Sequence, residues 1–404
     1  MIVLMEIDAK DYGFDTSSLD FVSNPYPVYE KMRAGPPLVW CDELSMWLVS
    51  RHSCANDLLR SQKLGRVFAE RQPLGEWEVF NWLNTESLLD SEPPSHTRMR
   101  RSLAPIFSRG GVGRMEEMVK GACEGLIGDI EAKITKFGSF DLVKDFAEPL
   151  PVHVICELLG IPRQDWDRTR DWSLAMVNLY EYVRTDAENV QGLGGARDFA
   201  ALISNLASDR RTSAQDDVVS VLIANPEGIE SERELIANCV LLFNGGTGAT
   251  INALGNGVTE LLSRGDQLNL YLSDPMAYTD TAVEEFLRFE APLQLFERTV
   301  LEDVTLWDRS LAKGSKVGLL FGSANRDSEI FDDANGFDIS RTRNQHLTFS
   351  AGTHFCLGAP LARLEIQTAL PMLFHKFPAL RLSGDPVPQN TFVVRGYSSV
   401  PVTA

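Results

Sequence analysis

One cysteine, Cys356, lies in a glycine-containing loop directly before a helical run. The loop reads Phe349-Ser-Ala-Gly-Thr-His-Phe-Cys-Leu-Gly358 and continues into Ala359-Pro-Leu-Ala-Arg-Leu-Glu365. Gly352 and Gly358 let the backbone approach a flat group closely, because glycine has no Cβ. The free N–H groups at the start of the following helix favour an anionic sulfur. The segment therefore predicts a thiolate presented at a helix N-terminus, ready to bind a metal.

Every fixed position of this loop matches the pattern Phe-x-x-Gly-x-His/Arg-x-Cys-x-Gly, so the loop resembles the haem-ligand signature of the cytochrome P450 family. The resemblance implies haem b (iron protoporphyrin IX) as cofactor and Cys356 as its axial metal ligand, since a thiolate trans to bound oxygen favours O–O cleavage. It also implies that Phe349 packs against the sulfur and that Gly352 and Gly358 contact the cofactor. The alternative is a buried cysteine that serves only as a small hydrophobic residue.

One position of the loop departs from the family. Ser350 stands where the loop normally carries glycine. A serine fits there only if an L-residue can adopt the required backbone conformation. Its hydroxyl would then be able to adjust hydrogen bonding near the sulfur.

Composition limits the partners of the chain. Its 404 residues are 44% hydrophobic and 23% charged, and no linker or repeat divides them, so we expect one large domain over 1–404. The net charge of −18 argues against nucleic acid and against an anionic membrane surface. Six cysteines without paired spacing suit a reducing compartment. Residues 1–6 do not resemble a signal segment, and no apolar run is long enough for a membrane span. We therefore expect a soluble, cytoplasmic protein.

Hydrophobic spacing of three and four predicts a mainly α-helical fold with minor β-sheets. Strands are expected near 36–50, 299–319 and 391–403, and Ser231 with Glu234 predicts a capping box at the longest helix. The resemblance implies the same α-rich domain, with the haem between the long central helix and the helix after the Cys356 loop. Helices are expected at 24–33, 113–137, 165–182, 191–207 and 231–263.

Segments far from Cys356 also match the family. Glu285 and Arg288 lie three apart on one helix face, where they can form an ion pair. The resemblance adds Arg341 as a third member, in a structural role. It also assigns the haem propionates to cationic and imidazole side chains. These residues are His96, Arg100, Arg298 and His354.

The long helix carries the main departure from the family. Members usually have an acid and an alcohol here that relay protons during oxygen activation. Aligned on Gly246, this chain has Gly248 in place of the acid and Ala249 in place of the alcohol. Thr250, and Thr247 before the gap, are the hydroxyls left to serve. Four glycines in 245–255 weaken the helix, each by up to about 1 kcal/mol relative to alanine, so we expect a local widening or kink.

Three functions remain open. The chain is a monooxygenase that inserts one oxygen atom from O2 into a small hydrophobic substrate, with Thr250, water or a substrate hydroxyl replacing the relay. Alternatively, it uses peroxide or nitric oxide and needs no relay. In the third alternative it binds haem without turnover, as a sensor. The family resemblance favours the first, with a role in secondary metabolism.

The chain carries no flavin or iron–sulfur motif of its own. The resemblance implies electrons from a ferredoxin and its reductase, so NAD(P)H is used only indirectly. Arginines gathered at 98–114 predict either a docking face for an acidic redox partner or a solvated helix face. The substrate is either free or tethered to a carrier protein. Arg66 and Arg71, in the aromatic segment 64–88, either pair with a substrate carboxylate or are exposed.

Overall fold

The computed structural model describes residues 7–404, so the expectation about residues 1–6 falls outside it. Sixteen α-helices form most of the described chain, as the hydrophobic spacing predicts. They are α1 (Leu19–Ser23), α2 (Tyr26–Ala34), α3 (His52–Arg60), α4 (Leu74–Thr85), α5 (Ser95–Leu103), α6 (Arg109–Gly113), α7 (Glu116–Phe137), α8 (Pro149–Leu159), α9 (Trp166–Asn178), α10 (Asp186–Thr212), α11 (Val218–Ile223), α12 (Glu232–Leu262), α13 (Gly265–Ser273), α14 (Pro275–Phe289), α15 (Phe321–Ala324) and α16 (Ala359–Lys376).

Short strands form four small sheets. The largest has five strands in the order β1-β2-β8-β5-β3, and only the β2–β8 pair is parallel. The strands are β1 (Val39–Cys41), β2 (Met46–Val49), β3 (Leu64–Gly65), β4 (Phe140–Asp141), β5 (Leu295–Val300), β6 (Val304–Leu306), β7 (Arg309–Leu311), β8 (Lys316–Leu320), β9 (Arg381–Leu382), β10 (Val387–Pro388), β11 (Tyr397–Ser399) and β12 (Pro401–Thr403).

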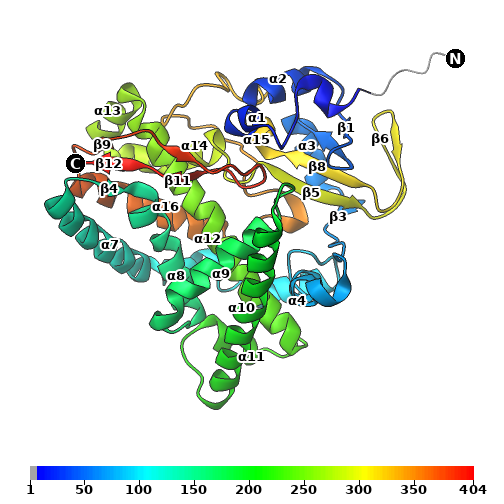
Figure 1. The fold of residues 1–404 in the computed structure, drawn as a ribbon, viewed down its shortest axis with the longest axis horizontal. Coiled ribbons are helices and arrows are strands. Elements are labelled where there is room, and N and C mark those ends of the chain that lie inside the picture. Colours follow the sequence, from blue (N-terminus) through cyan, green and yellow to red (C-terminus); the bar gives the residue numbers. More distant parts are fainter. Residues whose placement is uncertain (1–6) are drawn as a thin grey trace.

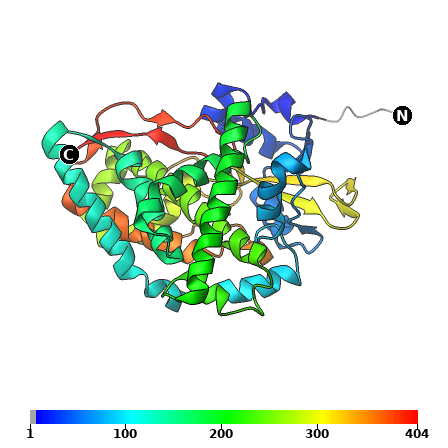
Figure 2. The same ribbon diagram turned by 60° about the horizontal axis from the view of Figure 1, so that its bottom comes forward.

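The five-stranded sheet and the N-terminal helices lie on one side of the molecule, and most helices lie on the other (Figure 1). Turning the molecule shows α10 crossing the face of the helical side (Figure 2). Helix α12 passes through the middle and packs against α4, α8, α10 and α14. Within residues 7–404, no helix is both long enough and apolar enough to cross a membrane.

Helix α12 begins as the sequence indicates but differs in two details. The Ser231 side chain accepts a hydrogen bond from the Glu234 backbone N–H at 3.0 Å. The return bond to Ser231 is absent, because the Glu234 carboxylate instead accepts from the Glu230 backbone N–H at 2.8 Å and pairs with Arg98 at 2.6 Å. The helix is also a continuous α-helix across 245–255, so the expected widening is not found. Packing on four helices outweighs the weak helix propensity of its glycines.

The buried pair Glu285–Arg288 ties α14 to the segment before the Cys356 loop. Both side chains are fully buried, and two hydrogen bonds of 2.7 Å join them. The Arg341 guanidinium lies 3.3 Å from the same carboxylate, which confirms the predicted third member. The carboxylate also accepts from the Asp338 backbone at 2.8 Å and from Asn344 at 3.1 Å.

A second buried carboxylate fixes the connection after α9. Glu181 is 4% exposed and accepts three backbone hydrogen bonds of 2.9 Å each. The donors are Phe392, Val393 and Val394, in the loop before β11. One side chain therefore joins two segments that are more than two hundred residues apart in sequence.

We predict that Glu285→Gln destabilises the folded protein by about 3–5 kcal/mol, because Arg288 keeps a buried charge without a counter-ion. Denaturant unfolding measures the change. The matched control is Glu302→Gln, which removes an exposed partner of Lys63. That variant should change the free energy of unfolding by less than about 1 kcal/mol. Equal losses in the two variants would contradict the assigned role of the buried pair.

Candidate functional site

The Cys356 loop closes on itself before α16 begins. The Cys356 backbone N–H donates to the Phe349 carbonyl at 2.8 Å. The sulfur accepts backbone hydrogen bonds from Gly358 and Ala359, as the helix N-terminus predicts. Burial nevertheless raises the pKa of the Cys356 thiol, and these bonds, with Arg100 and Arg363, offset the rise only in part. A thiolate at this position is therefore stabilised best by a bound cation.

Two loop residues adopt left-handed backbone conformations. Ser350 has a φ of 62°, so the serine does occupy the conformation that the family usually gives to glycine. This conformation costs an L-residue roughly 1–2 kcal/mol. Gly352 has a φ of 68°, and a Cβ there would lie 2.5 Å from the Leu59 carbonyl oxygen. The close neighbour that requires this glycine is thus the C-terminal end of α3.

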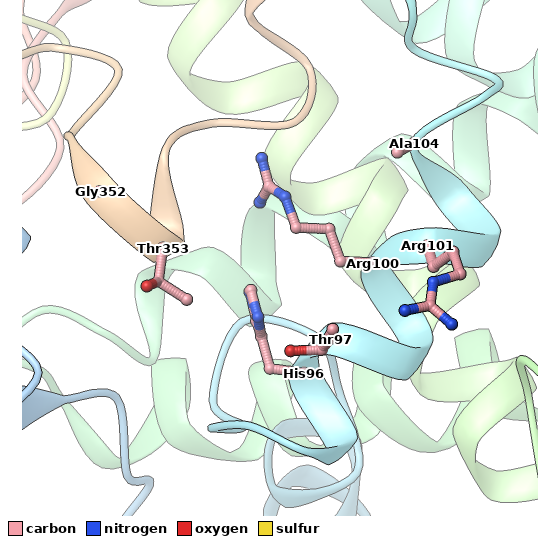
Figure 3. A pocket seen from close by; sticks show the side chains of 7 residues that line it. All are labelled: His96, Thr97, Arg100, Arg101, Ala104, Gly352 and Thr353. Atoms are coloured by element: carbon pink, nitrogen blue, oxygen red, sulfur yellow. The ribbon is translucent and has the colours of Figure 1, made fainter.

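A cavity of about 450 Å³ separates the loop from α5. His96 and Arg100 point from α5 toward the loop, whereas Arg101 points away (Figure 3). Arg100 donates to the Phe355 carbonyl at 2.8 Å, next to Cys356. The cavity is lined by His96, Thr97, Arg100, Arg101, Ala104, Gly352 and Thr353.

The two histidines of the site lie side by side. The His96 and His354 ring centroids are 4.6 Å apart. Burial, followed by the nearby His354 and Arg100, lowers the pKa of His96 to about 4. His354 is 2.8 Å from a Glu92 carboxylate oxygen. Of the two rings, His96 is the one that forms no hydrogen bond to another described residue.

Arg298 is a buried cation without a carboxylate partner. It is 1% exposed, and its guanidinium donates only to the Glu297 carbonyl at 3.2 Å and to the Ser350 hydroxyl at 3.3 Å. Burial, followed by the nearby Arg66, lowers the pKa of Arg298 to about 9. No side chain among residues 7–404 forms an ion pair with it, and a buried charge is costly unless an anion pairs with it. The donor set therefore fits an anionic cofactor such as haem, whose propionates would supply the counter-charge.

The central helix presents an open face without a proton donor. Gly245 and Ala249 are the only exposed residues between Leu235 and Leu262, and an added Cβ at Gly248 would meet no atom within 4 Å. Thr250 is only 4% exposed and lies about 120° round the helix from the midline between Gly245 and Ala249. Thr247 is 2% exposed and donates to the Phe243 carbonyl at 2.9 Å. Gly246 lies against Ile155, where an added Cβ would be 3.4 Å away.

The structure thus brings most of the expected residues together and places Thr250 apart from them. His96 and Arg100 from α5 and Arg298 from β5 approach the Cys356 loop. Thr250 is buried away from the open face of α12, whereas Gly246 and Gly248 are half-buried at its two edges. Phe349 is buried in the same hydrophobic core against which Cys356 packs. An added Cβ at Gly358 would meet no atom, so this glycine leaves space beside the sulfur.

A charge network behind the loop is not evident from the sequence. Arg363 donates to both Glu284 oxygens at 2.6 and 2.9 Å, and His346 is 3.1 Å from the same carboxylate. The Arg363 guanidinium lies 4.5 Å from the centre of the Phe349 ring. The network therefore positions Phe349 and adds positive charge near Cys356. Arg363 stands in the run 359–365 after the cysteine, but no sequence spacing links it to Glu284.

Comparison with known proteins gives a consistent result. The family profile described as Cytochrome P450 matches residues 197–396. A vitamin D(3) 25-hydroxylase from Pseudonocardia autotrophica is 32% identical over 96% of each chain. The crystal structure of P450BioI with an acyl carrier protein ligated to hexadec-9Z-enoic acid superposes with a TM-score of 0.90, at 28% identity over 96% of this chain and 100% of that chain. A myxobacterial cytochrome P450 in complex with myristic acid superposes with a TM-score of 0.85, at 31% identity over 95% of this chain and 97% of that chain.

We predict that Arg298→Met has opposite effects on the apoprotein and on cofactor retention. Removing an unpaired buried charge should leave apoprotein stability unchanged or raise it. Haem affinity should fall by about tenfold or more, because a charge-assisted contact is lost. Unfolding of the apoprotein and haem transfer to apomyoglobin measure the two effects. Arg326→Met is the control, because Arg326 already pairs with Glu290 at 2.7 Å and its loss should destabilise the apoprotein. Unchanged haem transfer in Arg298→Met would contradict the assignment.

Proposed function

The chain belongs to the cytochrome P450 family of monooxygenases, and we propose that it inserts one oxygen atom from O2 into a small hydrophobic substrate. The observation that carries this proposal is that the unpaired cation Arg298 donates to Ser350, in the same loop that carries Cys356. Haem b, when bound, supplies the iron at which oxygen is activated. The proposal assigns the whole chain, 1–404, to one haem-thiolate domain.

Each site residue receives a role in this proposal. Cys356 is the axial ligand, and the hydrogen bonds from Gly358 and Ala359 hold its sulfur in place. Arg298, Arg100 and His96 bind the propionates. His354 also binds a propionate once its ring exchanges the Glu92 carboxylate for that group. Phe349 shields the sulfur, because Arg363 and its network hold the ring in position.

Oxygen binds against the open face of α12, at Gly248 and Ala249. Neither residue can donate a proton from its side chain. Thr250 is buried, which supports a proton donor other than Thr250. Ordered water or a substrate hydroxyl in the space beside Gly248 supplies the protons. The second candidate function, peroxide or nitric oxide chemistry, is favoured by the same observation, because it does not require this relay.

A vitamin D(3) 25-hydroxylase and the structures in complex with an acylated carrier protein and with myristic acid support a hydrophobic substrate. A polyketide-biosynthesis cytochrome P450 from Bacillus subtilis, 31% identical over 96% of this chain, supports a role in secondary metabolism. The proposal includes both a free substrate and a substrate tethered to a carrier protein.

Electrons come from a ferredoxin and its reductase, which use NAD(P)H. Three arginines near the Cys356 side of the molecule support docking of an acidic partner. Arg101, Arg109 and Arg114 are exposed and form no ion pair with any residue in 7–404. Arg98, by contrast, is neutralised by Glu230 and Glu234.

The first test is the absorption spectrum of the reduced protein with carbon monoxide. We expect the position typical of a thiolate ligand and its loss in Cys356→Ser. Product formed with ferredoxin, reductase and NAD(P)H, but not with peroxide, supports the oxygen-dependent reaction. Product formed only with peroxide favours the second candidate function. Absence of turnover with both oxidants, across a panel of hydrophobic substrates, favours haem binding without catalysis.

We predict that Gly248→Glu with Ala249→Thr raises the yield of product per NAD(P)H, because the space beside Gly248 accepts a side chain and the pair supplies a proton donor. General acid catalysis gives about 10²–10⁴-fold where it is fully used, so a several-fold gain is expected here. The control is Thr250→Ala, which should change the yield by less than about twofold. A large loss in that control would restore Thr250 as the donor and contradict our assignment.

A further inference from the structure

Arg71, between β3 and α4, has an aromatic setting but no anionic partner. Its guanidinium lies 4.9 Å from the ring centres of both Trp77 and Phe80. Asn81, which is 3% exposed, binds the Arg71 backbone through hydrogen bonds of 2.9 and 3.0 Å. The position of this arginine is therefore fixed by the fold.

Within residues 7–404, the guanidinium of Arg71 donates no hydrogen bond. Its Nη1 atom is buried and has no partner in this part of the chain. No acidic residue in 7–404 forms an ion pair with this side chain. Burial, followed by the positive charge of Arg184, lowers the pKa of Arg71 to about 10. The side chain therefore keeps its charge at neutral pH while it lacks a counter-ion.

Arg66, a few residues earlier, shows the ordinary arrangement. Its guanidinium is 2.7 Å from Asp90, and it also donates to the Glu297 carbonyl at 3.2 Å. The fold thus neutralises one arginine of this segment and leaves the other unneutralised.

The polar groups around Arg71 already have partners. Tyr180 donates to Asn84 at 2.6 Å, and Tyr182 donates to the Glu297 carboxylate. Glu297 also lies 3.8 Å from Lys316. The Arg66 guanidinium lies 4.8 Å from the centre of the Phe296 ring, and the Arg298 guanidinium lies 4.7 Å from the same ring, so the segment that carries Arg71 adjoins the proposed cofactor edge.

We propose that Arg71 binds the carboxylate of an acidic substrate, with Arg184 as a second nearby positive charge. The planar guanidinium can donate two parallel hydrogen bonds to a carboxylate, and the two flanking rings hold it in one orientation. The apolar part of the substrate then extends toward the open face of α12. This proposal rests on the proposed function and names its substrate class as hydrophobic acids.

The test compares acids with their methyl esters on the cofactor-loaded enzyme. The probes are dodecanoate and 3-phenylpropanoate, each with its methyl ester. Binding is followed by the ferric spin-state shift and by equilibrium dialysis. We expect the wild-type protein to bind at least one acid about tenfold or more tightly than its ester, because hydrogen bonds to charged groups are the strong ones. In Arg71→Gln the ratio of the affinity for the acid to the affinity for its ester should fall to about one, mainly because the acid binds more weakly.

Two further variants separate recognition from structure. Arg71→Lys keeps the charge and should retain part of the preference. Arg66→Gln removes the neutralised arginine and should keep the full preference. The carbon monoxide spectrum of each variant reports cofactor loading, so a failure of the proposed function is distinguished from a failure of this inference. Equal binding of acid and ester, no acid binding, or a preference that survives in Arg71→Gln would each overturn the proposal.

Discussion

The buried carboxylate of Glu285 determines where the rest of the site lies. It binds Arg288 on its own helix and also the Asp338 backbone and Asn344 in the segment that leads to the Cys356 loop. A charged group without water must have its hydrogen bonds satisfied, so this segment has little freedom to shift. The loop that carries Cys356 begins five residues after Asn344. Its position relative to α14 and α5 therefore depends on an ion pair that touches no substrate.

Positive charge is distributed unevenly around the site. Arg66 and Arg326 are neutralised by carboxylates, whereas the buried Arg298 and the half-buried Arg71 have none among residues 7–404. Such groups lower the stability of the empty protein, since desolvation is not offset by an anion. They raise the affinity for anionic ligands for the same reason. Arg298 fits the cofactor and Arg71 fits the substrate proposed above, so ligand binding and folding are coupled through both.

The features that could be predicted are those with a local sequence signal. The Cys356 loop, the helix spans and the Glu285–Arg288 pair depend on fixed short spacings. The Glu284–Arg363–His346 network and the contacts of Glu181 join distant segments through common residue types. No short sequence spacing predicts these contacts. The separation of Thr250 from the face of Gly245 and Ala249 could have been predicted, because helix geometry sets it about 120° from the midline of that pair. The missing half of the capping box could not have been predicted, because Arg98, which competes for Glu234, comes from another helix.

The Glu181 carboxylate has a consequence for motion. Three backbone N–H groups from adjacent residues bind its two oxygens. Separating the connection after α9 from the C-terminal loop would leave these donors and a buried carboxylate without partners, which is costly. We therefore expect the two segments to open seldom and to exchange their backbone amide hydrogens slowly.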